Sequence, residues 1–269
     1  MTAPPARFVL PTRFNGPPET ANGGYACGYF AGLAASRHGP DVAVTLLAPP
    51  PLGTELTFHP GARRSQVRHG ERLIATVAGG AGEFDAPAPV GLAAAREAST
   101  RFLGTTSHPF PTCFVCGTDR AVGDGLLLAP GAVAGRPSTV ACVWTPDRSD
   151  ADRRGDVGTP VVWAVLDCPG GWTDDPAEEP MVLSRMAARI YGRPAPGRPH
   201  VVVGRRLRRS GRTAVNVTAL HDTDGNLIAE ASSVWAAVNG TATPVVPHVH
   251  NRASAESTAE WTHGGHRAE

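Results

Sequence analysis

Two stretches of this chain, about 150 residues apart, follow the same pattern, and this internal repetition constrains the fold more than any other feature. In each stretch a glycine and a leucine lead into an arginine-rich polar segment, which is followed by a turn and an apolar run. The matching positions are Gly53 and Gly204, Leu56 and Leu207, Leu73 and Leu227, and Ala75 and Ala229, spaced by 151 residues in the first two pairs and by 154 in the last two. A lengthened hairpin in the second stretch accounts for the difference. We therefore expect two similar halves that arose by internal duplication.

Each half combines a helix-like segment with several strands. Residues 213–220 alternate with period two and are rich in Val and Thr, which is typical of a half-buried strand. Turn-forming residues follow at 221–226, and the chain returns as a second strand over 227–238. Small and apolar residues at 23–35 and 159–167 predict one buried helix ahead of each strand set. The sequence thus predicts an α+β fold in which an antiparallel sheet wraps around a central helix in each half.

Shifts in composition indicate the domain boundaries. The first unit is expected over 1–85, a linker with a short helix over 86–106, and the second unit over 107–239. Beyond it, residues 240–269 are rich in Thr, Pro, His, Ser and Glu and poor in apolar residues, which predicts a disordered tail.

Charge and composition exclude several classes of function. The chain has 269 residues, and all 25 of its basic residues are arginine, so neither a lysine Schiff base nor a phosphate-loop lysine exists. A formal net charge of +1 gives no broad electrostatic reason to bind nucleic acid. No apolar run approaches the ~20 residues that span a bilayer, and the N-terminus lacks the pattern of an export signal. Five cysteines, an odd number, suit a reducing compartment, so we expect a soluble cytoplasmic protein with no membrane partner.

The segment Ala21-Asn22-Gly23-Gly24-Tyr25 resembles the start of the central helix in the hot-dog superfamily of acyl-thioester enzymes. The longer run 14–25 is most similar to the first half of the double hot-dog acyl-CoA thioesterases, of the acyl-CoA thioesterase II type. The second half is similar at 163–167, 191–194 and 224–233. The resemblance implies a double hot-dog fold with two antiparallel sheets joined into one continuous sheet. It also implies hydrolysis of an acyl-CoA or acyl-carrier thioester.

The same resemblance implies roles for three residues of the second half. Asp167 matches an aspartate near the end of the second helix, and Ser184 occupies the place of a threonine that precedes an aromatic-x-Arg-Pro segment. Ser233 aligns with a glutamine. Serine keeps the hydroxyl of threonine but lacks the reach of a glutamine amide. We expect Asp167, Ser184 and Ser233 to be the catalytic residues, with Asp167 orienting or deprotonating the attacking water.

Substrate binding is expected at the start of the first helix. Gly23 and Gly24 have no side chains to block a carbonyl, and their N–H groups and the helix dipole favour a developing oxyanion. Asn22 offers a further amide donor, and Tyr25 completes the expected substrate-binding set. The competing interpretation is that the two glycines only form a tight turn into the helix and that Asp167 is structural.

The motif Cys113-Phe-Val-Cys116 leaves alternatives open. With His108 and one distant cysteine, Cys142 or Cys168, it could complete a zinc site. A redox pair is the second alternative and plain buried cysteine the third. No second Cys-x-x-Cys exists, and our expectation is that the protein uses neither metal nor cofactor. A cluster of arginines has two interpretations: it binds the phosphates of coenzyme A, or it forms the solvated face of a hairpin. Its members are Arg205, Arg206, Arg208, Arg209 and Arg212.

The sequence therefore predicts an acyl thioester hydrolase whose partner is an acyl-CoA or acyl-carrier thioester substrate, with a homodimer as the candidate assembly. One alternative is a non-catalytic acyl-thioester-binding protein of the same fold that lost the glutamine. Another is a hot-dog dehydratase or hydratase, although neither predicted helix contains the histidine which that chemistry normally needs.

Overall fold

The computed structural model describes residues 4–80, 82, 84–151, 155–174 and 179–238. The expected tail over 240–269 lies outside these residues. The strands are β1 (Ala6–Val9), β2 (Val42–Leu46), β3 (Glu55–His59), β4 (Arg64–His69), β5 (Arg72–Gly79), β6 (Gly131–Ala132), β7 (Thr139–Trp144), β8 (Met181–Ile190), β9 (His200–Ser210), β10 (Thr213–His221) and β11 (Leu227–Ala237). The helices are α1 (Gly23–His38), α2 (Leu92–Ser99), α3 (Thr159–Val165) and α4 (Cys168–Gly171), with 3₁₀ turns at Thr12–Phe14, Leu103–Thr105 and Arg148–Asp150.

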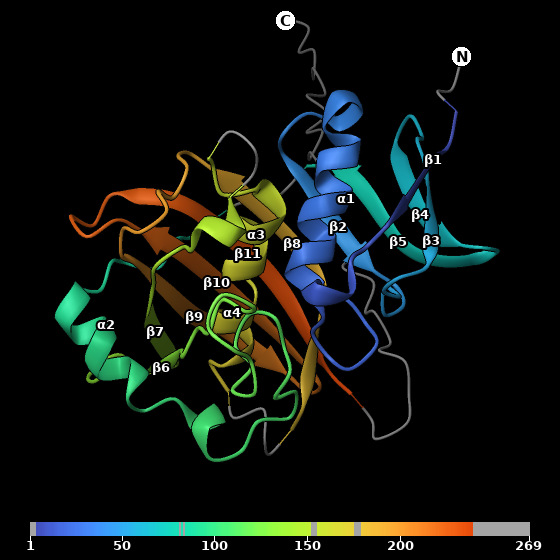
Figure 1. Ribbon diagram of the computed structural model, residues 1–269. Coiled ribbons are helices and arrows are strands. Elements are labelled where there is room, and N and C mark those ends of the chain that lie inside the picture. The colour runs from blue at the N-terminus through green and yellow to red at the C-terminus, as the bar shows by residue number, and fades with distance from the viewer. Residues whose placement is uncertain (1–3, 81, 83, 152–154, 175–178, 239–269) are drawn as a thin grey trace, which may run out of the picture.

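All eleven strands form one antiparallel sheet, in the order β1-β3-β4-β5-β2-β8-β11-β10-β9-β7-β6 (Figure 1). The two halves meet where β2 pairs with β8, with Val44 opposite Met186. Read outward from this seam, the first half runs β2-β5-β4-β3-β1 and the second β8-β11-β10-β9-β7-β6, so the first five strands of each half match in rank and the short edge strand β6 has no counterpart. The prediction of an α+β fold with a continuous sheet is confirmed. That the halves arose by duplication stays a prediction.

The matched hairpins also share a local irregularity. In the β4–β5 hairpin the register shifts between Val67 and Arg68, just after Val67 pairs with Ala75. In the β10–β11 hairpin it shifts between Leu220 and His221, just after Leu220 pairs with Ala229. A β-bulge increases the local twist of a strand pair. The bulges therefore lie at matching places in the two hairpins.

The helices of the two halves cross at a contact made of glycine. A Cβ atom on Gly24 would lie 2.5 Å from Cβ of Asp167 and 2.6 Å from the carbonyl oxygen of Trp163. On the next turn of α1, a Cβ on Gly28 would lie 2.7 Å from Cβ of Trp163. Small residues at such spacing let two helix backbones approach closely. The start of α1 is thereby brought against the end of α3 (Figure 1).

The second helix differs from the expected one. A continuous helix was predicted over 159–167, but α3 ends at Val165 and a separate turn, α4, begins at Cys168. Pro169 explains the break, because proline has no N–H to donate to the carbonyl of Val165 four residues earlier and its ring crowds that carbonyl. Asp167 lies in the break, and it joins the two short helices.

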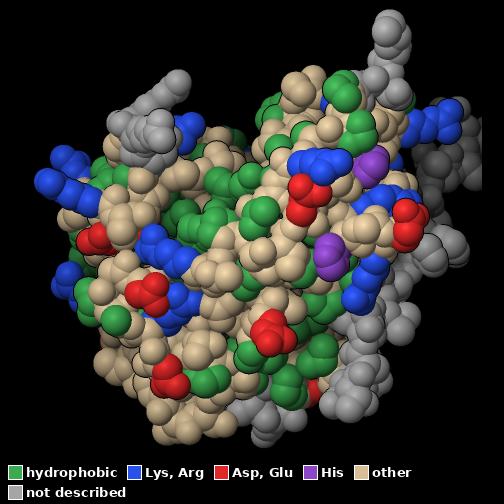
Figure 2. All heavy atoms as spheres, turned by 45° about the vertical axis from the view of Figure 1, so that its right-hand side comes forward, with side chains coloured by type: hydrophobic (Ala, Val, Ile, Leu, Met, Phe, Trp, Pro, Cys, Tyr) green, Lys and Arg blue, Asp and Glu red, His purple; other side chains and the backbone are tan. Residues whose placement is uncertain are grey.

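The surface carries mixed charge. Figure 2 shows a face on which basic and acidic side chains are interspersed rather than gathered by sign. Within the arginine cluster, Arg205 pairs with Asp85 at 2.7 Å, and Arg206 and Arg209 both pair with Asp174. This pairing favours the hairpin-face interpretation of the cluster. No helix among the described residues is both long and apolar enough to cross a lipid bilayer.

Candidate active site

A cavity of about 680 Å³ lies where elements of the two halves meet. Its floor includes Asn22 and Gly23 at the start of α1 and Asp167 and Cys168 at the break between α3 and α4. Apolar side chains and a series of prolines make up most of the remaining lining: Pro17, Pro18, Leu46, Pro49, Pro50, Pro51, Pro109, Phe110, Trp172, Met181, Leu183 and Trp235. A largely apolar pocket with a few convergent polar groups is typical of a ligand site.

Asp167 is the charged group at the centre of this floor. It is buried, and its Oδ2 accepts hydrogen bonds from the backbone N–H of Gly24 at 2.8 Å and from Nδ2 of Asn22 at 3.1 Å. Its Oδ1 has no hydrogen-bond partner among the described residues. A buried carboxylate oxygen without a donor is unusual. The free oxygen lies on a residue that borders the cavity, so a water or ligand in the cavity is the natural donor.

The surroundings of Asp167 favour its neutral form. Burial, the largest effect, raises its pKa to about 7, and the charge of Cys113 acts in the same direction, while the donors Gly24 and Asn22 act against both. At neutral pH the carboxyl group therefore changes its protonation readily. Perturbed carboxyl groups of this kind cluster at functional sites.

Two of the first three N–H groups of α1 are hydrogen-bonded within the protein. Gly24 donates to Asp167, and Tyr25 donates to Oδ1 of Asn22, which caps the helix at 2.9 Å. Among the described residues the N–H of Gly23 has no acceptor, and Gly23 lines the cavity. The structure therefore leaves one helix N–H, that of Gly23, to a ligand. The ring of Tyr25 stacks on Phe14 at 3.8 Å between centroids and lies outside the cavity lining.

The two predicted serines do not join Asp167. Ser184 lies at a bulge in β8, and its hydroxyl donates to the carbonyl of Val234 at 3.0 Å. The hydroxyl of Ser233 donates to the carbonyl of Asn216 at 3.4 Å beneath α4. Neither residue borders the cavity, and within the described part of the chain neither is hydrogen-bonded to Asp167. Their predicted catalytic role stays a prediction.

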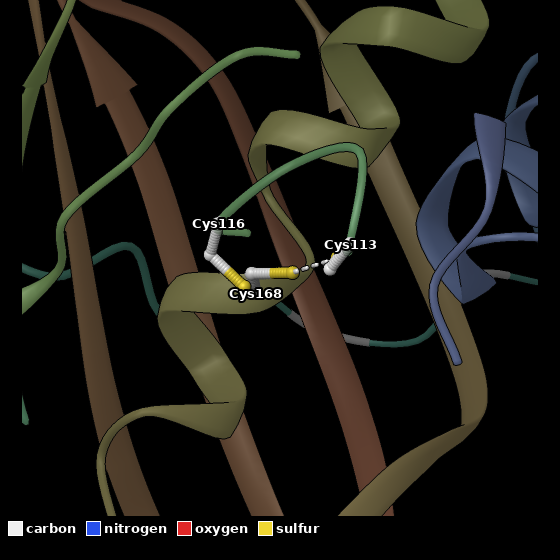
Figure 3. Close-up of side chains that lie close together, drawn as sticks. All are labelled: Cys113, Cys116 and Cys168. Carbon is white, nitrogen blue, oxygen red and sulfur yellow. Dashed lines mark hydrogen bonds between the residues drawn. The ribbon is translucent and has the colours of Figure 1, made fainter. Parts of the chain in front are cut away.

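Three cysteines meet beside Asp167. The Sγ atoms of Cys113, Cys116 and Cys168 all lie within 4.8 Å of one another, and those of Cys113 and Cys168 are 3.9 Å apart (Figure 3). All three residues are buried and line the cavity. Hydrogen bonds from the Cys116 and Cys168 thiols hold the pKa of Cys113 well below its usual range, and the same contacts together with burial raise the pKa of the other two. The cluster thus favours one thiolate, on Cys113.

His108 is not free to join this cluster. Its Nδ1 accepts a hydrogen bond from the N–H of Phe110 at 3.0 Å, which places the proton on Nε2, and Nε2 donates to the carbonyl of Cys116 at 3.1 Å. Burial lowers the pKa of His108 and keeps the ring neutral. Of the two distant cysteines considered from the sequence, Cys168 is the one that joins the motif. Cys142 is buried in β7.

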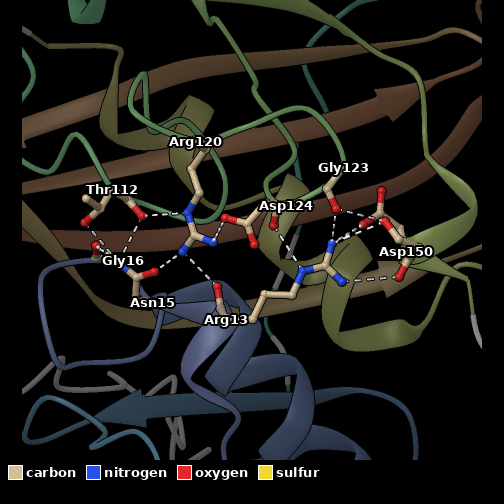
Figure 4. Close-up of polar contacts among 9 residues, drawn as sticks. Arg13, Asn15, Gly16, Thr112, Arg120, Gly123, Asp124 and Asp150 are labelled. Carbon is tan, nitrogen blue, oxygen red and sulfur yellow. Dashed lines mark hydrogen bonds and ion pairs between the residues drawn. The ribbon is translucent and has the colours of Figure 1, made fainter.

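A network of arginine contacts fixes the loop that carries Cys113 and Cys116 (Figure 4). Arg120 donates to the carbonyl of Thr112 at 2.9 Å and to that of Arg13 at 2.8 Å, and it also bonds Oδ1 of Asn15. Arg13 in turn bonds the carbonyl of Gly123 at 3.1 Å. The segment just before α1 and the cysteine loop are therefore held as one unit, which fixes both sides of the cavity floor.

Most of the apolar wall of the cavity has no signal in the sequence. Met181 and Leu183 reach the cavity from β8 and Trp235 from β11, directly opposite Leu183. The bulge in this pair shifts the alternation of inward and outward side chains, so counting residues along the strand does not identify them. Arg72, an exposed residue at the start of β5, also borders the cavity, and only the fold brings it there.

No protein-family model matches the chain, and no curated protein sequence matches it. Solved structures do match over most of its length. The tesB protein of Mycobacterium avium subspecies paratuberculosis has a TM-score of 0.55 and 14% sequence identity, with 87% of this chain and 93% of the other covered. A candidate thioesterase II from Thermobifida fusca has a TM-score of 0.57 and 14% identity, covering 87% and 92%. A protein of unknown function with a hot-dog fold from Alicyclobacillus acidocaldarius has a TM-score of 0.56 and 11% identity, covering 90% and 97%.

These matches define the class of fold. The chain has a double hot-dog fold, as the resemblance in its sequence predicted. One fold of this kind can host many activities, so the chemistry has to be argued from the residues around Asp167.

Proposed function

We propose that this protein hydrolyses acyl thioesters, with acyl-CoA as the substrate class. The observation that carries the proposal is Asp167, a residue of the cavity lining whose buried Oδ1 has no donor among the described residues, beside the N–H of Gly23, for which these residues offer no acceptor. A hydrolase needs an acceptor for the proton of water and a donor for the oxyanion that forms as water attacks. The pairing of one acceptor with one helix N–H meets both needs. Solved structures of the same fold named as a tesB protein and a candidate thioesterase II support the assignment.

In the proposed reaction the thioester carbonyl oxygen accepts the N–H of Gly23, and a water donates to Oδ1 of Asp167. The water oxygen bonds to the carbonyl carbon while Asp167 takes its proton, and the negative charge moves to the carbonyl oxygen. Collapse of this tetrahedral intermediate breaks the carbon–sulfur bond. The leaving thiolate then takes the proton from Asp167, which returns the site to its starting state. Asn22 and Gly24 act as positioning residues, because both hold Oδ2 and so aim Oδ1.

The cavity suits an acyl chain with an anionic carrier. Met181, Leu183, Trp172 and Trp235 offer an apolar wall for the acyl group. Arg72 at the exposed edge offers a cation to a phosphate, and a guanidinium matches phosphate geometry well.

The decisive variant is Asp167→Asn. Asparagine has the same shape, and its oxygen can still accept from Gly24 and Asn22, but it places an NH₂ group where the free Oδ1 was. We expect turnover to fall by about 10²- to 10⁴-fold, the usual contribution of a positioned acid or base, with little change in melting temperature. The assay is release of coenzyme A from short, long and aromatic acyl-CoA substrates.

Asp150→Asn is the matched control. Asp150 is also buried, and it is paired with Arg13 at 3.5 Å, but it lies outside the cavity. We expect this variant to keep its turnover. Full activity in Asp167→Asn would overturn the proposal.

One observation favours a second candidate, an acyl-thioester-binding protein without turnover. Ser233, which stands where related enzymes have a glutamine, is bonded to Asn216 and lies away from the cavity. An increase in melting temperature with acyl-CoA, without any release of coenzyme A, would identify such a binder.

A further inference from the structure

The convergence of Cys113, Cys116 and Cys168 is not needed for thioester hydrolysis by Asp167. The first two cysteines lie in the loop before β6, and the third begins α4, more than fifty residues later in the chain. Buried cysteines usually behave as small apolar residues and pack individually. Here three of them point their sulfur atoms at one another on the wall of a cavity (Figure 3).

We infer that Cys113, Cys116 and Cys168 bind one thiophilic metal ion of the zinc class through three thiolates, with the fourth position open to the cavity. The inference does not depend on the proposed hydrolysis. It replaces the expectation, drawn from the sequence, that no metal is used.

The spacing of the sulfur atoms suits a metal better than a disulfide. Two sulfurs that are each bound at ~2.3 Å to one tetrahedral zinc ion lie about 3.8 Å apart. The Sγ atoms of Cys113 and Cys168 are 3.9 Å apart, and the third sulfur lies within 4.8 Å of both. A disulfide would need two sulfurs at about 2.05 Å. The three atoms therefore already surround a point that a metal ion could occupy with small adjustments.

A side-chain N–H donor also lies beside one of the sulfur atoms. Nδ2 of Asn22 donates to Sγ of Cys168 at 3.7 Å. Partners of this kind orient metal-binding side chains and spread their charge, so this donor would support the Cys168 ligand once a metal ion is bound.

The fourth position has no protein side chain assigned to it. Both ring nitrogens of His108 are engaged in hydrogen bonds, and among the described residues no carboxylate oxygen lies within 4.8 Å of all three sulfur atoms. All three cysteines line the cavity, so a water or a ligand that enters the cavity completes the tetrahedron. Three protein ligands with one open position is the arrangement found in catalytic rather than purely structural zinc sites.

The test is metal analysis of the tag-free full-length chain, prepared under reducing conditions with zinc present. We expect about one zinc ion per chain, as one tetrahedral site predicts. We also expect Co²⁺ to replace zinc and to give a sulfur-to-cobalt charge-transfer band. Cys168→Ala should lose the metal and the band. The matched control is Cys142→Ala, which removes an equally buried thiol outside the cluster and should keep both.

Two results would overturn the inference. The first is a reduced wild-type chain that takes up neither Zn²⁺ nor Co²⁺. The second is metal that stays bound in Cys168→Ala, since it would then be held elsewhere, for example by the histidines near the C-terminus. The cobalt spectrum of the wild type reports thiolate ligands without any variant, so a poorly folding Cys168→Ala does not weaken the test. Because no step requires activity, the result is independent of the Asp167→Asn experiment.

Discussion

The central helices of the two halves occupy matching places but differ in form, and the active-site proposal depends on that difference. In the first half α1 runs unbroken for 16 residues from an asparagine cap. In the second, α3 has 7 residues and α4 has 4, with Asp167 between them. The unbroken helix offers N–H donors at its start. The broken helix places the carboxylate of Asp167 and the thiol of Cys168 at the break, where both residues line the cavity.

The two halves are therefore complementary at the cavity. Donors come from Asn22, Gly23 and Gly24, and the acceptor comes from Asp167. Neither half has both. Two similar halves can divide the chemistry in this way because the contact between their helices brings a residue of one half onto the helix start of the other.

The strongest way to break this arrangement is Gly24→Ala. The added methyl group would lie 2.5 Å from Cβ of Asp167 and 2.6 Å from a backbone oxygen, so α1 and α3 must move apart. We expect a loss of about 2 to 4 kcal/mol in the free energy of unfolding, since overpacking is joined here by loss of the hydrogen bond to Asp167. Urea unfolding measures the change.

Gly32→Ala is the control on the same helix. Gly32 is exposed, and nothing lies within 4 Å of the site of the new methyl group. Alanine is the better helix former, so this variant should gain up to about 1 kcal/mol. Equal effects of the two substitutions would show that the helix contact does not depend on Gly24.

The sequence was sufficient for the fold because its signals were local or repeated. The Asp224-Gly225 turn predicted the last hairpin, and the matched leucines predicted the paired strands. The sequence predicts Asn22, Gly24 and Asp167 as site residues, and the structure brings these three into contact. The N–H of Gly24, which is expected from the sequence to face the substrate, donates to Asp167, and the roles of the three residues stay predictions.

The parts that could not be predicted depend on long-range contacts or on small shifts. Nothing in the spacing of Cys113 and Cys168 shows that they meet, since helix packing alone decides it. At Ser184 a single bulge residue turns the hydroxyl toward the carbonyl of Val234. The break after Val165 had a signal in Pro169, but the apolar run before it favoured a longer helix.

Mild acid should weaken the second half selectively. Among the described histidines the buried ones are His200 and His221, both in the second half. Burial lowers the pKa of each, so the folded state resists protonation while the unfolded chain takes up protons below about pH 6.5. Stability is therefore fully present above that pH. Below it, each histidine removes up to about 1.4 kcal/mol per pH unit until the folded group also titrates.

Urea unfolding at pH 7.5 and 5.5, followed by tryptophan fluorescence, tests this prediction, because Trp144, Trp163, Trp172 and Trp235 all lie in the second half. His200→Phe should shrink the loss on acidification, whereas His69→Phe, at an exposed position in the first half, should not. Asp167 takes up a proton in the same range and offsets part of the fall, so the comparison is made between variant and wild type. An unchanged pH dependence in His200→Phe would contradict the assignment.

The smallest effect, and the sharpest test of the difference between the helices, is expected from Pro169→Ala. Alanine restores an N–H that can reach the carbonyl of Val165, so the variant allows α3 and α4 to join as one helix like α1. Losing proline also frees the unfolded chain, which should lower stability by about 0.4 to 1 kcal/mol. If Pro169 holds Asp167 at the break, turnover should fall while the affinity for acyl-CoA changes little, because the apolar wall from β8 and β11 is untouched. A loss of affinity equal to the loss of turnover would mean instead that the proline shapes the cavity and not the carboxylate.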